Sequence, residues 1–282
     1  MIEVRSPGSL TTIQDLGRPG WAHLGVPPSG AADPRSLRLA NRLVGNAEGA
    51  AALEATIRGP VLRFEQAAVV ALAGAPVEAL IDGRPVPMHT VEHVAAGEVL
   101  EVGFAKAAAR TYLAIRGGID VERVLGSRST DVLSGLGPPA LAAGTRLTMG
   151  DEAGAWPTTE TAPVPPLGTS PVLRVAAGPR DDRFAPDALE VLCGAAWEVS
   201  SASNRVGVRL RGPSLAPVDH TELESEGLVT GALEVPPSGQ PILLLPDHPT
   251  TGGYPVLAVV VSADLPLTGQ LRPGDKVAFR PA

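Results

Sequence analysis

Short apolar segments separated by glycine and proline are the feature that most constrains the fold of this chain. The 282 residues include 32 glycines and 29 prolines, which fall between apolar segments such as 69–72, 111–115 and 257–261. Short runs of aliphatic residues bounded by turn formers are typical of strands. Only 3% of the residues are aromatic, so the core must come from Ala, Val, Leu and Ile. We therefore predict a mainly β fold with a few short helices.

A proline-rich stretch divides the sequence. Residues 156–171 show no apolar period and are stiffened by prolines, which is typical of a linker. We expect an N-terminal domain over residues 1–155 and a C-terminal domain over residues 172–282. Three short matches occur in the same order in both halves and suggest a duplicated barrel. They pair 58–62 with 211–215, 82–86 with 238–242, and 96–100 with 273–277.

Charge and hydropathy exclude several classes of protein. The net charge is −7, the acidic residues are scattered, and no Lys/Arg run could bind a polyanion. Nucleic-acid binding is therefore not expected. The N-terminus lacks the basic and apolar regions of a signal peptide, and no apolar run approaches the roughly 18 residues that span a bilayer. We expect a cytoplasmic protein without membrane contact. The single cysteine, Cys193, lies in an apolar run and is expected to be buried and unreactive.

The run Asp247-His248-Pro249-Thr250-Thr251-Gly252-Gly253-Tyr254-Pro255 is the candidate functional loop of the second half. It holds more glycine and threonine than a turn requires. Hydroxyls and backbone amides without side chains suit a loop that cradles a carbonyl, carboxylate or phosphate. A long hairpin loop with no binding role is the alternative.

Polar residues are also dense in two loops near the N-terminus, which contain Gln14, Asp15, Arg18, Ser29 and Asp33. Asp33 precedes a proline and an apolar period, so its expected role is to cap a helix that stops at a glycine. The apolar face of that helix is predicted to contain Leu37, Ala40, Leu43 and Val44.

Two further segments suit anion binding. Arg116 follows a predicted strand and precedes Gly117-Gly118, which would allow a close backbone approach beside a cation. The run Ser127-Arg128-Ser129-Thr130-Asp131 places three hydroxyls around an arginine. For this run, an Asx or Ser/Thr turn that opens a short helix is the alternative.

For three other polar residues, the sequence predicts no role in a functional site. Glu54 lies in a predicted strand, and we place it on an exposed face because an unpaired buried carboxylate is costly. His89 and His93 are four residues apart but lack a nearby third ligand, so no metal site is predicted.

These motifs in order resemble one family across essentially the whole chain. That family is known as biotin-dependent carboxyltransferase, allophanate hydrolase subunit 2, KipA-like protein, and the C subunit of bacterial 5-oxoprolinase. The resemblance implies tandem cyclophilin-like β-barrel subdomains, which agrees with the duplicated, turn-rich pattern. It rests on residues 11–18, 25–33, 117–119, 125–130, 225–227 and 247–255.

The resemblance implies three alternative roles. One branch, a hydrolase, opens 5-oxoproline to glutamate with ATP, beside a KipI-like B subunit and a LamB/YcsF-like A subunit. A second is the carboxyltransferase component of a biotin-dependent urea carboxylase or allophanate hydrolase type system. A third is a non-catalytic KipA-like regulator of a sensor kinase. We expect the first, acting on an amide or lactam within a heteromeric complex. The sequence has no Walker-type Gly-x-x-x-x-Gly-Lys-Ser/Thr loop that would locate the ATP.

Opening a lactam requires a stabilised oxyanion and an acid or base for the departing nitrogen. We expect the polar loops of both halves to meet in one cleft shared with the partner. Asp15 or Asp247 is the candidate acid or base, and Tyr254 the candidate hydrogen-bond donor. Substrate or anion contacts are expected from Gln14, Arg18, Ser29, Arg116, Ser127, Arg128, Ser129, Thr250, Thr251, Gly252 and Gly253.

Three residues depart from what the resemblance implies. The family usually has Met, Asp and Gln where this chain has Ala32, Asn204 and Glu234. Glu234 places a charge where an amide is expected, and this bears on the type of substrate.

Overall fold

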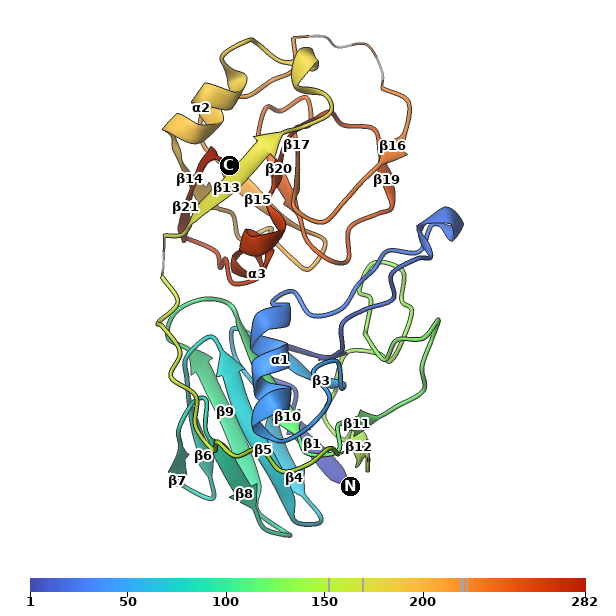
Figure 1. The fold of residues 1–282 in the computed structure, drawn as a ribbon, viewed down its shortest axis with the longest axis vertical. Helices are drawn as coiled ribbons and strands as arrows, with labels where there is room; N and C mark the ends of the chain where they lie inside the picture. The colour runs from blue at the N-terminus through green and yellow to red at the C-terminus, as the bar shows by residue number, and fades with distance from the viewer. Residues whose placement is uncertain (152, 169, 219–220, 222) are drawn as a thin grey trace. The chain divides into compact units, whose positions relative to one another are not determined.

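The computed structural model describes residues 1–282 except 152, 169, 219–220 and 222 (Figure 1). The described chain divides into two units. The N-terminal unit comprises Met1–Arg18 and Ser29–Leu167, and the C-terminal unit comprises Pro19–Pro28 and Gly168–Ala282. The early segment that carries the short helix η1 (Ala22–Leu24) therefore groups with the later part of the chain. Of the predicted linker 156–171, Thr169 lies outside the described residues.

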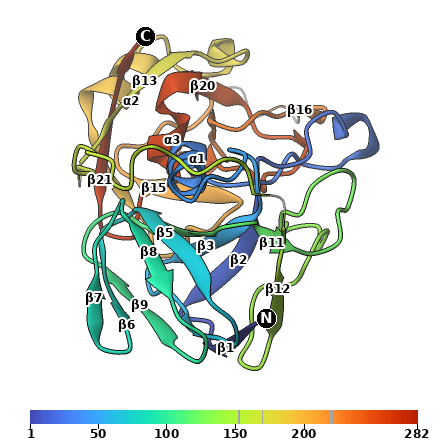
Figure 2. The same ribbon diagram turned by 60° about the horizontal axis from the view of Figure 1, so that its bottom comes forward.

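The strands of the N-terminal unit form a seven-stranded and a five-stranded sheet, both with antiparallel pairs. Their strand orders are β11-β12-β1-β4-β9-β6-β7 and β2-β3-β10-β5-β8. Figure 2 shows the β6 and β7 hairpin, whose turn residues Asp82 and Gly83 have φ values of 45° and 82°. The strands are β1 (Ile2–Ser6), β2 (Leu10–Gln14), β3 (Ala52–Thr56), β4 (Val61–Phe64), β5 (Ala68–Gly74), β6 (Val77–Ile81), β7 (Arg84–Val86), β8 (Val91–Val94), β9 (Val99–Ala105), β10 (Arg110–Ile115), β11 (Ile119–Asp120) and β12 (Arg146–Met149).

The main core of this unit is formed by residues from both sheets. Val4 and Phe64 from the seven-stranded sheet belong to the same buried cluster as Leu53, Leu72 and Leu113 from the five-stranded sheet. Every residue of β10 is buried because helix α1 covers the second face of the five-stranded sheet. Removal of this aliphatic surface from water provides the driving force for the fold.

Helix α1 (Pro34–Leu43) begins at the predicted cap. Asp33 Oδ1 accepts hydrogen bonds from the backbone N–H groups of Arg35 and Ser36, both at 3.1 Å. Proline at the first helical position costs no hydrogen bond, because that N–H has no partner within a helix. The predicted apolar face, including Leu37 and Leu43, packs on the sheet. The prediction of this helix is confirmed.

Glu54 is buried, so its predicted exposed position is wrong. Its carboxylate accepts hydrogen bonds from the Tyr112 hydroxyl at 2.7 Å and the Ala32 N–H at 2.9 Å, and lies 3.2 Å from Arg110 Nε. The Tyr112 hydroxyl in turn accepts from the Asp33 N–H at 2.7 Å. Burial raises the pKa of Tyr112 well above its ordinary value, so this hydroxyl stays protonated and donates to Glu54. The network fastens the loop before α1 to the sheet.

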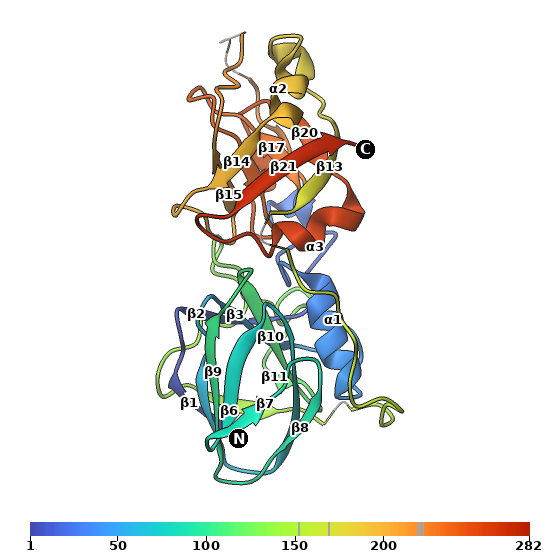
Figure 3. The same cartoon turned by 90° about the vertical axis from the view of Figure 1, so that its left-hand side faces the viewer.

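The C-terminal unit contains a closed barrel with the strand order β13-β20-β17-β18-β15-β14-β21 (Figure 3). Its core includes Trp197, whose Nε1–H donates to the Leu192 carbonyl at 2.9 Å. A separate two-stranded ribbon pairs β16 with β19. The elements are β13 (Val172–Ala177), η2 (Asp181–Arg183), α2 (Ala188–Gly194), β14 (Ala196–Val199), β15 (Gly207–Arg211), β16 (Glu226–Gly227), β17 (Ala232–Glu234), β18 (Ile242–Leu244), β19 (Thr251–Gly252), β20 (Val256–Val260), η3 (Ser262–Asp264), α3 (Leu265–Thr268) and β21 (Lys276–Pro281).

The mainly β prediction with a few short helices is confirmed. One of the three short repeated matches, 96–100 with 273–277, falls at equivalent places in the two units. Gly97 precedes β9 and Gly274 precedes β21, with φ values of 94° and 88°. Within the described residues, no helix is long and apolar enough to cross a membrane.

We expect Glu54→Ala to lower the free energy of unfolding by about 3–5 kcal/mol, because it removes the carboxylate beside the buried Arg110 guanidinium. Urea denaturation measures this change. Glu78→Ala serves as the control, since its ion pair with Lys106 is exposed to solvent and should contribute little to stability. Equal effects of the two substitutions would contradict a structural role for the Glu54 network.

Candidate functional site

Asp15 joins two polar loops of the N-terminal unit. Its Oδ1 accepts hydrogen bonds from the hydroxyls of Ser127 and Ser129, both at 2.6 Å, and from the Gly17 N–H at 2.7 Å. Its Oδ2 accepts from the Arg128 N–H at 2.7 Å. The side chain is buried, and these partners occupy both of its oxygens. The contacts give Asp15 a structural role, in which it fixes the 127–129 loop to the end of β2.

The hydroxyls of Ser127 and Ser129 are fully used within this cluster. Besides donating to Asp15, Ser127 Oγ accepts from the Ser129 N–H at 2.9 Å, and Ser129 Oγ accepts from the Asp15 N–H at 3.0 Å. The alternative prediction for residues 127–131 is an Asx or Ser/Thr turn that opens a short helix. The turn is present, but the described residues of this segment form no helix. Asp131 does form an Asx turn by accepting from the N–H groups of Leu133 and Ser134, but no described helix follows.

The two arginines of these loops bind protein oxygens. Arg18 is 1% exposed, and it donates from Nη2 to the Ser129 carbonyl and from Nε to the Val124 carbonyl at 3.3 Å. Arg128 donates from Nε to the Val121 carbonyl at 2.8 Å and pairs with Asp120 at 3.0 Å. Both guanidinium groups therefore shape the loops. Their predicted role as anion contacts stays a prediction.

Gln14 and Thr130 each present a buried polar atom to which no described residue forms a hydrogen bond. Gln14 Nε2 donates to the Thr130 carbonyl at 2.9 Å and to Thr12 Oγ1 at 3.0 Å. Ser29 Oγ donates to the same carbonyl at 3.0 Å. Within the described part of the chain, neither Gln14 Oε1 nor Thr130 Oγ1 has a hydrogen-bond partner. A buried acceptor without a donor costs about 1–3 kcal/mol, so Gln14 Oε1 is a place where a water or a ligand N–H would be stabilised.

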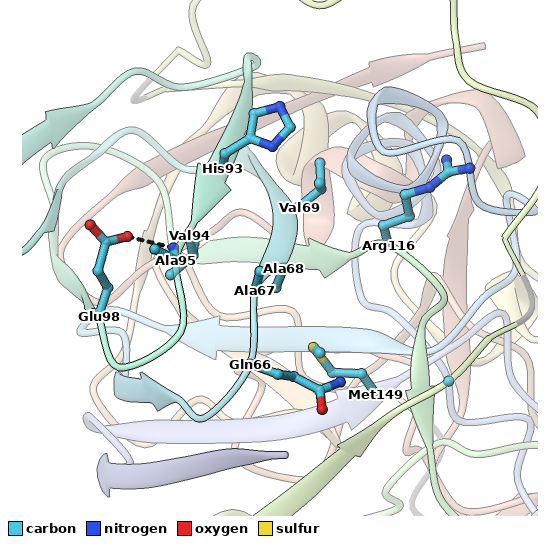
Figure 4. Close-up of a pocket in the computed structure, with 11 residues that line it drawn as sticks. Gln66, Ala67, Ala68, Val69, His93, Val94, Ala95, Glu98, Arg116 and Met149 are labelled. Atoms are coloured by element: carbon cyan, nitrogen blue, oxygen red, sulfur yellow. Dashed lines mark hydrogen bonds between the residues drawn. The ribbon is translucent and has the colours of Figure 1, made fainter.

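Arg116 has a different environment from the one predicted for an anion contact. Its guanidinium donates to the carbonyls of Val44 at 2.8 Å and Gly154 at 2.7 Å, and lies 3.8 Å from the ring centre of Trp156. It also borders a shallow depression of about 580 Å³, in which Figure 4 shows its side chain directed away from Gln66 and Glu98. These contacts tie the 154–156 segment to the end of β10.

In the C-terminal unit, Asp247 forms a buried ion pair with Arg205. The carboxylate accepts hydrogen bonds from Arg205 Nε at 2.9 Å and Nη2 at 3.0 Å, and both side chains are almost completely buried. This bidentate geometry is the strong form of a charge-assisted hydrogen bond. It gives Asp247 the role of anchoring the start of the candidate loop. The sequence alone does not identify Arg205 as part of this site, because its partner Asp247 lies 42 residues away in the sequence.

The candidate loop continues into the β16–β19 ribbon, formed by residues 226–227 and 251–252. Gly252 pairs with Glu226, and the Leu228 N–H donates to the Thr250 carbonyl at 2.9 Å. Arg180 holds the ribbon through Glu226, with its Nε at 2.9 Å and 3.0 Å from the two carboxylate oxygens. Thr251, Gly253 and Tyr254 are exposed and can meet a ligand.

Glu234 is a buried residue for which the sequence predicted no site. It is 6% exposed, and its Oε1 has no hydrogen-bond partner among the residues that the structure describes. Burial raises the pKa of this carboxyl to about 7. The departure from the family pattern was the only available signal, and it did not show that the side chain is buried.

The predicted site residues thus form two groups. Gln14, Asp15, Arg18, Ser29 and residues 127–129 come together in the N-terminal unit. Asp247 and residues 250–254 belong to the C-terminal unit, whereas the contacts of Arg116 are with the 44–45 and 154–156 segments. A single cleft that joins the two groups stays a prediction. Among the described residues, no group of three or more His, Cys, Asp or Glu side chains is placed to hold a metal ion.

A family model described as "Carboxyltransferase domain, subdomain A and B" matches residues 24–281. This chain therefore belongs to that family of carboxyltransferase domains. Its relatives are of two kinds. It is 37% identical to the C subunit of 5-oxoprolinase from Escherichia coli over 99% of this chain and 90% of the relative. It is 35% identical to urea amidolyase of Lachancea kluyveri over 99% of this chain and 17% of the relative.

Solved structures agree with this membership. The crystal structure of TTHA0988 matches with a TM-score of 0.90 at 38% identity, over 99% of this chain and 55% of TTHA0988. The crystal structure of K. lactis urea amidolyase matches with a TM-score of 0.92 at 34% identity, over 99% of this chain and 18% of that protein. This chain thus spans about half of TTHA0988 and less than a fifth of the urea amidolyase.

We expect Asp15→Asn to lower the free energy of unfolding by about 1–3 kcal/mol, because its amide NH2 would face a donor of the 127–129 loop. Chemical denaturation measures the loss. Asp120→Asn is the matched control, since Asp120 forms a partly exposed ion pair with Arg128. A variant with unchanged stability would show that the Asp15 contacts do not hold the loop.

We expect Asp247→Asn and Arg205→Met each to destabilise the chain by about 3–5 kcal/mol, because each leaves a buried charge without its partner. The double variant should lose less than the sum of the two single losses. A double-mutant cycle from thermal or urea unfolding measures this coupling. Additive losses would show that the two residues do not act as a pair.

Proposed function

We propose that this chain is the C subunit of a 5-oxoprolinase, which opens the lactam of 5-oxoproline to glutamate with ATP. The observation that supports this most is the match to the C subunit of the E. coli 5-oxoprolinase, which extends over 90% of that relative. The corresponding subunit from Haemophilus influenzae matches over the same share at 34% identity. We further propose that the complex includes a KipI-like B subunit and a LamB/YcsF-like A subunit.

The exposed part of the 250–254 loop is the proposed substrate contact in this chain. Opening a lactam develops negative charge on the carbonyl oxygen, and backbone N–H groups and hydroxyls stabilise such a charge. The Gly253 amide and the Tyr254 hydroxyl are of this type, and Tyr254 is 46% exposed. In the N-terminal unit, Gln14 Oε1 would accept a ligand N–H. Asp15 and Asp247 are proposed to position these loops, in place of the acid or base role expected from the sequence.

Two observations are against a nucleoside triphosphate site in the described part of the chain. The sequence has no Walker-type loop, and two arginines of the candidate site donate to protein oxygens. Arg18 donates to the Ser129 carbonyl, and Arg128 donates to the Val121 carbonyl. We therefore assign ATP to another subunit of the complex.

The second candidate is the carboxyltransferase component of a biotin-dependent urea carboxylase or allophanate hydrolase type system. It is supported by the family model and by the TM-score of 0.92 to K. lactis urea amidolyase. A buried acceptor such as Gln14 Oε1 suits an N–H of urea or of the biotin ring as well as an N–H of a lactam. Gln14 therefore does not discriminate between the two candidates.

Co-expression with KipI-like and LamB/YcsF-like proteins from the same organism tests the proposal. We expect glutamate release that depends on ATP, on 5-oxoproline and on this chain. Tyr254→Phe should lower kcat at least about tenfold, or about 1.4 kcal/mol, without lowering the melting temperature. Val229→Ala is the control, because Val229 is also exposed and lies close in sequence to the ribbon.

Three outcomes would contradict the proposal. If glutamate release is unchanged when this chain is omitted, the chain has no role in the reaction. Carboxylation of urea that depends on carboxybiotin, without any opening of 5-oxoproline, would establish the second candidate. If no reaction occurs with any of these partners and substrates, the non-catalytic regulator is favoured.

A further inference from the structure

Glu234 lies outside the barrel core although it is buried. Its neighbours in sequence, Leu233 and Val235, belong to the barrel core. Ala232, two residues earlier on the same strand, belongs instead to a small cluster with Leu244 and Val256. Because side chains alternate along a strand, Glu234 shares the outer face of β17 with Ala232.

The β16–β19 ribbon covers this carboxyl. A Cβ atom built on Gly252 would lie 2.5 Å from Glu234 Oε1 and 2.7 Å from Leu228 Cδ1. The carboxyl therefore occupies the space that any side chain at residue 252 would need. With the side chains of Glu234 and Leu228 placed as they are, glycine at residue 252 lets the ribbon lie this close to Glu234.

The groups around the Glu234 carboxyl favour its protonated, neutral form. Its strand partners on β18 and β20 are Ile242 and Val256, and Leu228 adds a third apolar side chain. No described residue donates a hydrogen bond to Oε1. A buried carboxylate without a donor or a cation is costly, so the protonated form is favoured. This agrees with the raised pKa of about 7.

The charged group on the ribbon is Glu226, which pairs with Gly252. Arg180 holds it in a charge-assisted pair, and this contact lowers the pKa of Glu226. Glu224, on the segment before β16, is exposed. Strands β17, β18, β19 and β20 carry no other ionisable side chain. Because the pKa of Glu226 is lowered, its carboxylate stays charged from pH 6 to pH 8.

We propose that Glu234 is a positioning residue that controls the 250–254 loop through its protonation state. The neutral carboxyl lets the β16–β19 ribbon pack against the barrel, and this holds Thr251, Gly252, Gly253 and Tyr254 in their binding geometry. Loss of the proton to solvent places a negative charge beneath the ribbon, and the ribbon then lifts to hydrate that charge. The inference rests on the proposed function only in taking this loop as the substrate contact.

The direction of the pH effect follows from proton binding. A raised pKa means that the packed state holds the proton more tightly than a hydrated carboxyl, whose pKa is about 4.3. Rising pH therefore favours the lifted state until the packed form also ionises near pH 7. Between pH 6 and pH 8 the ratio of lifted to packed ribbon should rise about tenfold.

Hydrogen exchange on the whole chain tests this inference without any assay of activity. After correction for the intrinsic pH dependence of exchange, the protection of residues 226–228 and 250–254 should fall about tenfold from pH 6 to pH 8. Glu234→Gln keeps the size and polarity of the neutral side chain and cannot ionise, so its protection should not change with pH. Glu226→Gln is the control: it weakens the contact with Arg180 but should keep the pH dependence.

Either of two results would overturn the inference: protection in the wild type that is independent of pH, or a pH dependence that persists in Glu234→Gln. In the active complex, kcat/KM should fall above about pH 7 for the wild type and for Glu226→Gln, but not for Glu234→Gln. A complex without oxoprolinase activity, combined with the expected exchange pattern, would contradict the proposed function and leave the role of Glu234 established.

Discussion

The Asp15 carboxylate is the interaction on which the candidate site of the N-terminal unit depends. A buried carboxylate is tolerated only when donors compensate for its lost hydration. Asp15 obtains these donors from Gly17 in its own loop and from Ser127, Arg128 and Ser129, which lie more than a hundred residues later. The buried serine hydroxyls in turn need acceptors, and the Asp15 carboxylate provides them. One negative charge therefore fixes two loops that no secondary structure element joins.

Other buried carboxylates in the chain also hold loops through fixed hydrogen-bond donors. Glu234 is the exception among those discussed here. Glu54 holds the loop before α1 through the Ala32 N–H and the Tyr112 hydroxyl. Asp247 is held by Arg205 at the start of the candidate loop. These carboxylates gain fixed donors, and they stiffen the segments that they contact. Glu234 is also buried but lacks such donors, so its most stable form is neutral. Burial raises the pKa of Glu234 to about 7, so this carboxyl changes charge near physiological pH.

Most charged side chains of the candidate site hold the loops in place, and only a few other groups are proposed to meet the substrate. Fixed carboxylates and arginines build the scaffold. In the part of the chain that the structure describes, the groups proposed to meet a ligand are the exposed loop around Tyr254 and the Oε1 atom of Gln14. One relative is named as a subunit of 5-oxoprolinase, and this chain covers only 17% of a second relative, a urea amidolyase.

The sequence by itself determined the features that depend on local pattern. Alternating apolar segments specified a mainly β chain, Asp33 and Pro34 specified the start of α1, and the ordered motifs specified the family. It also located the polar loops, but it could not assign their side chains to roles. Only the tertiary structure showed that Asp15, Arg18 and Asp247 contact other protein groups, that Glu54 is buried, and that Glu234 lies under Gly252. The physical reason is that burial and hydrogen-bond partners arise from residues far apart in the chain, and no local period records them.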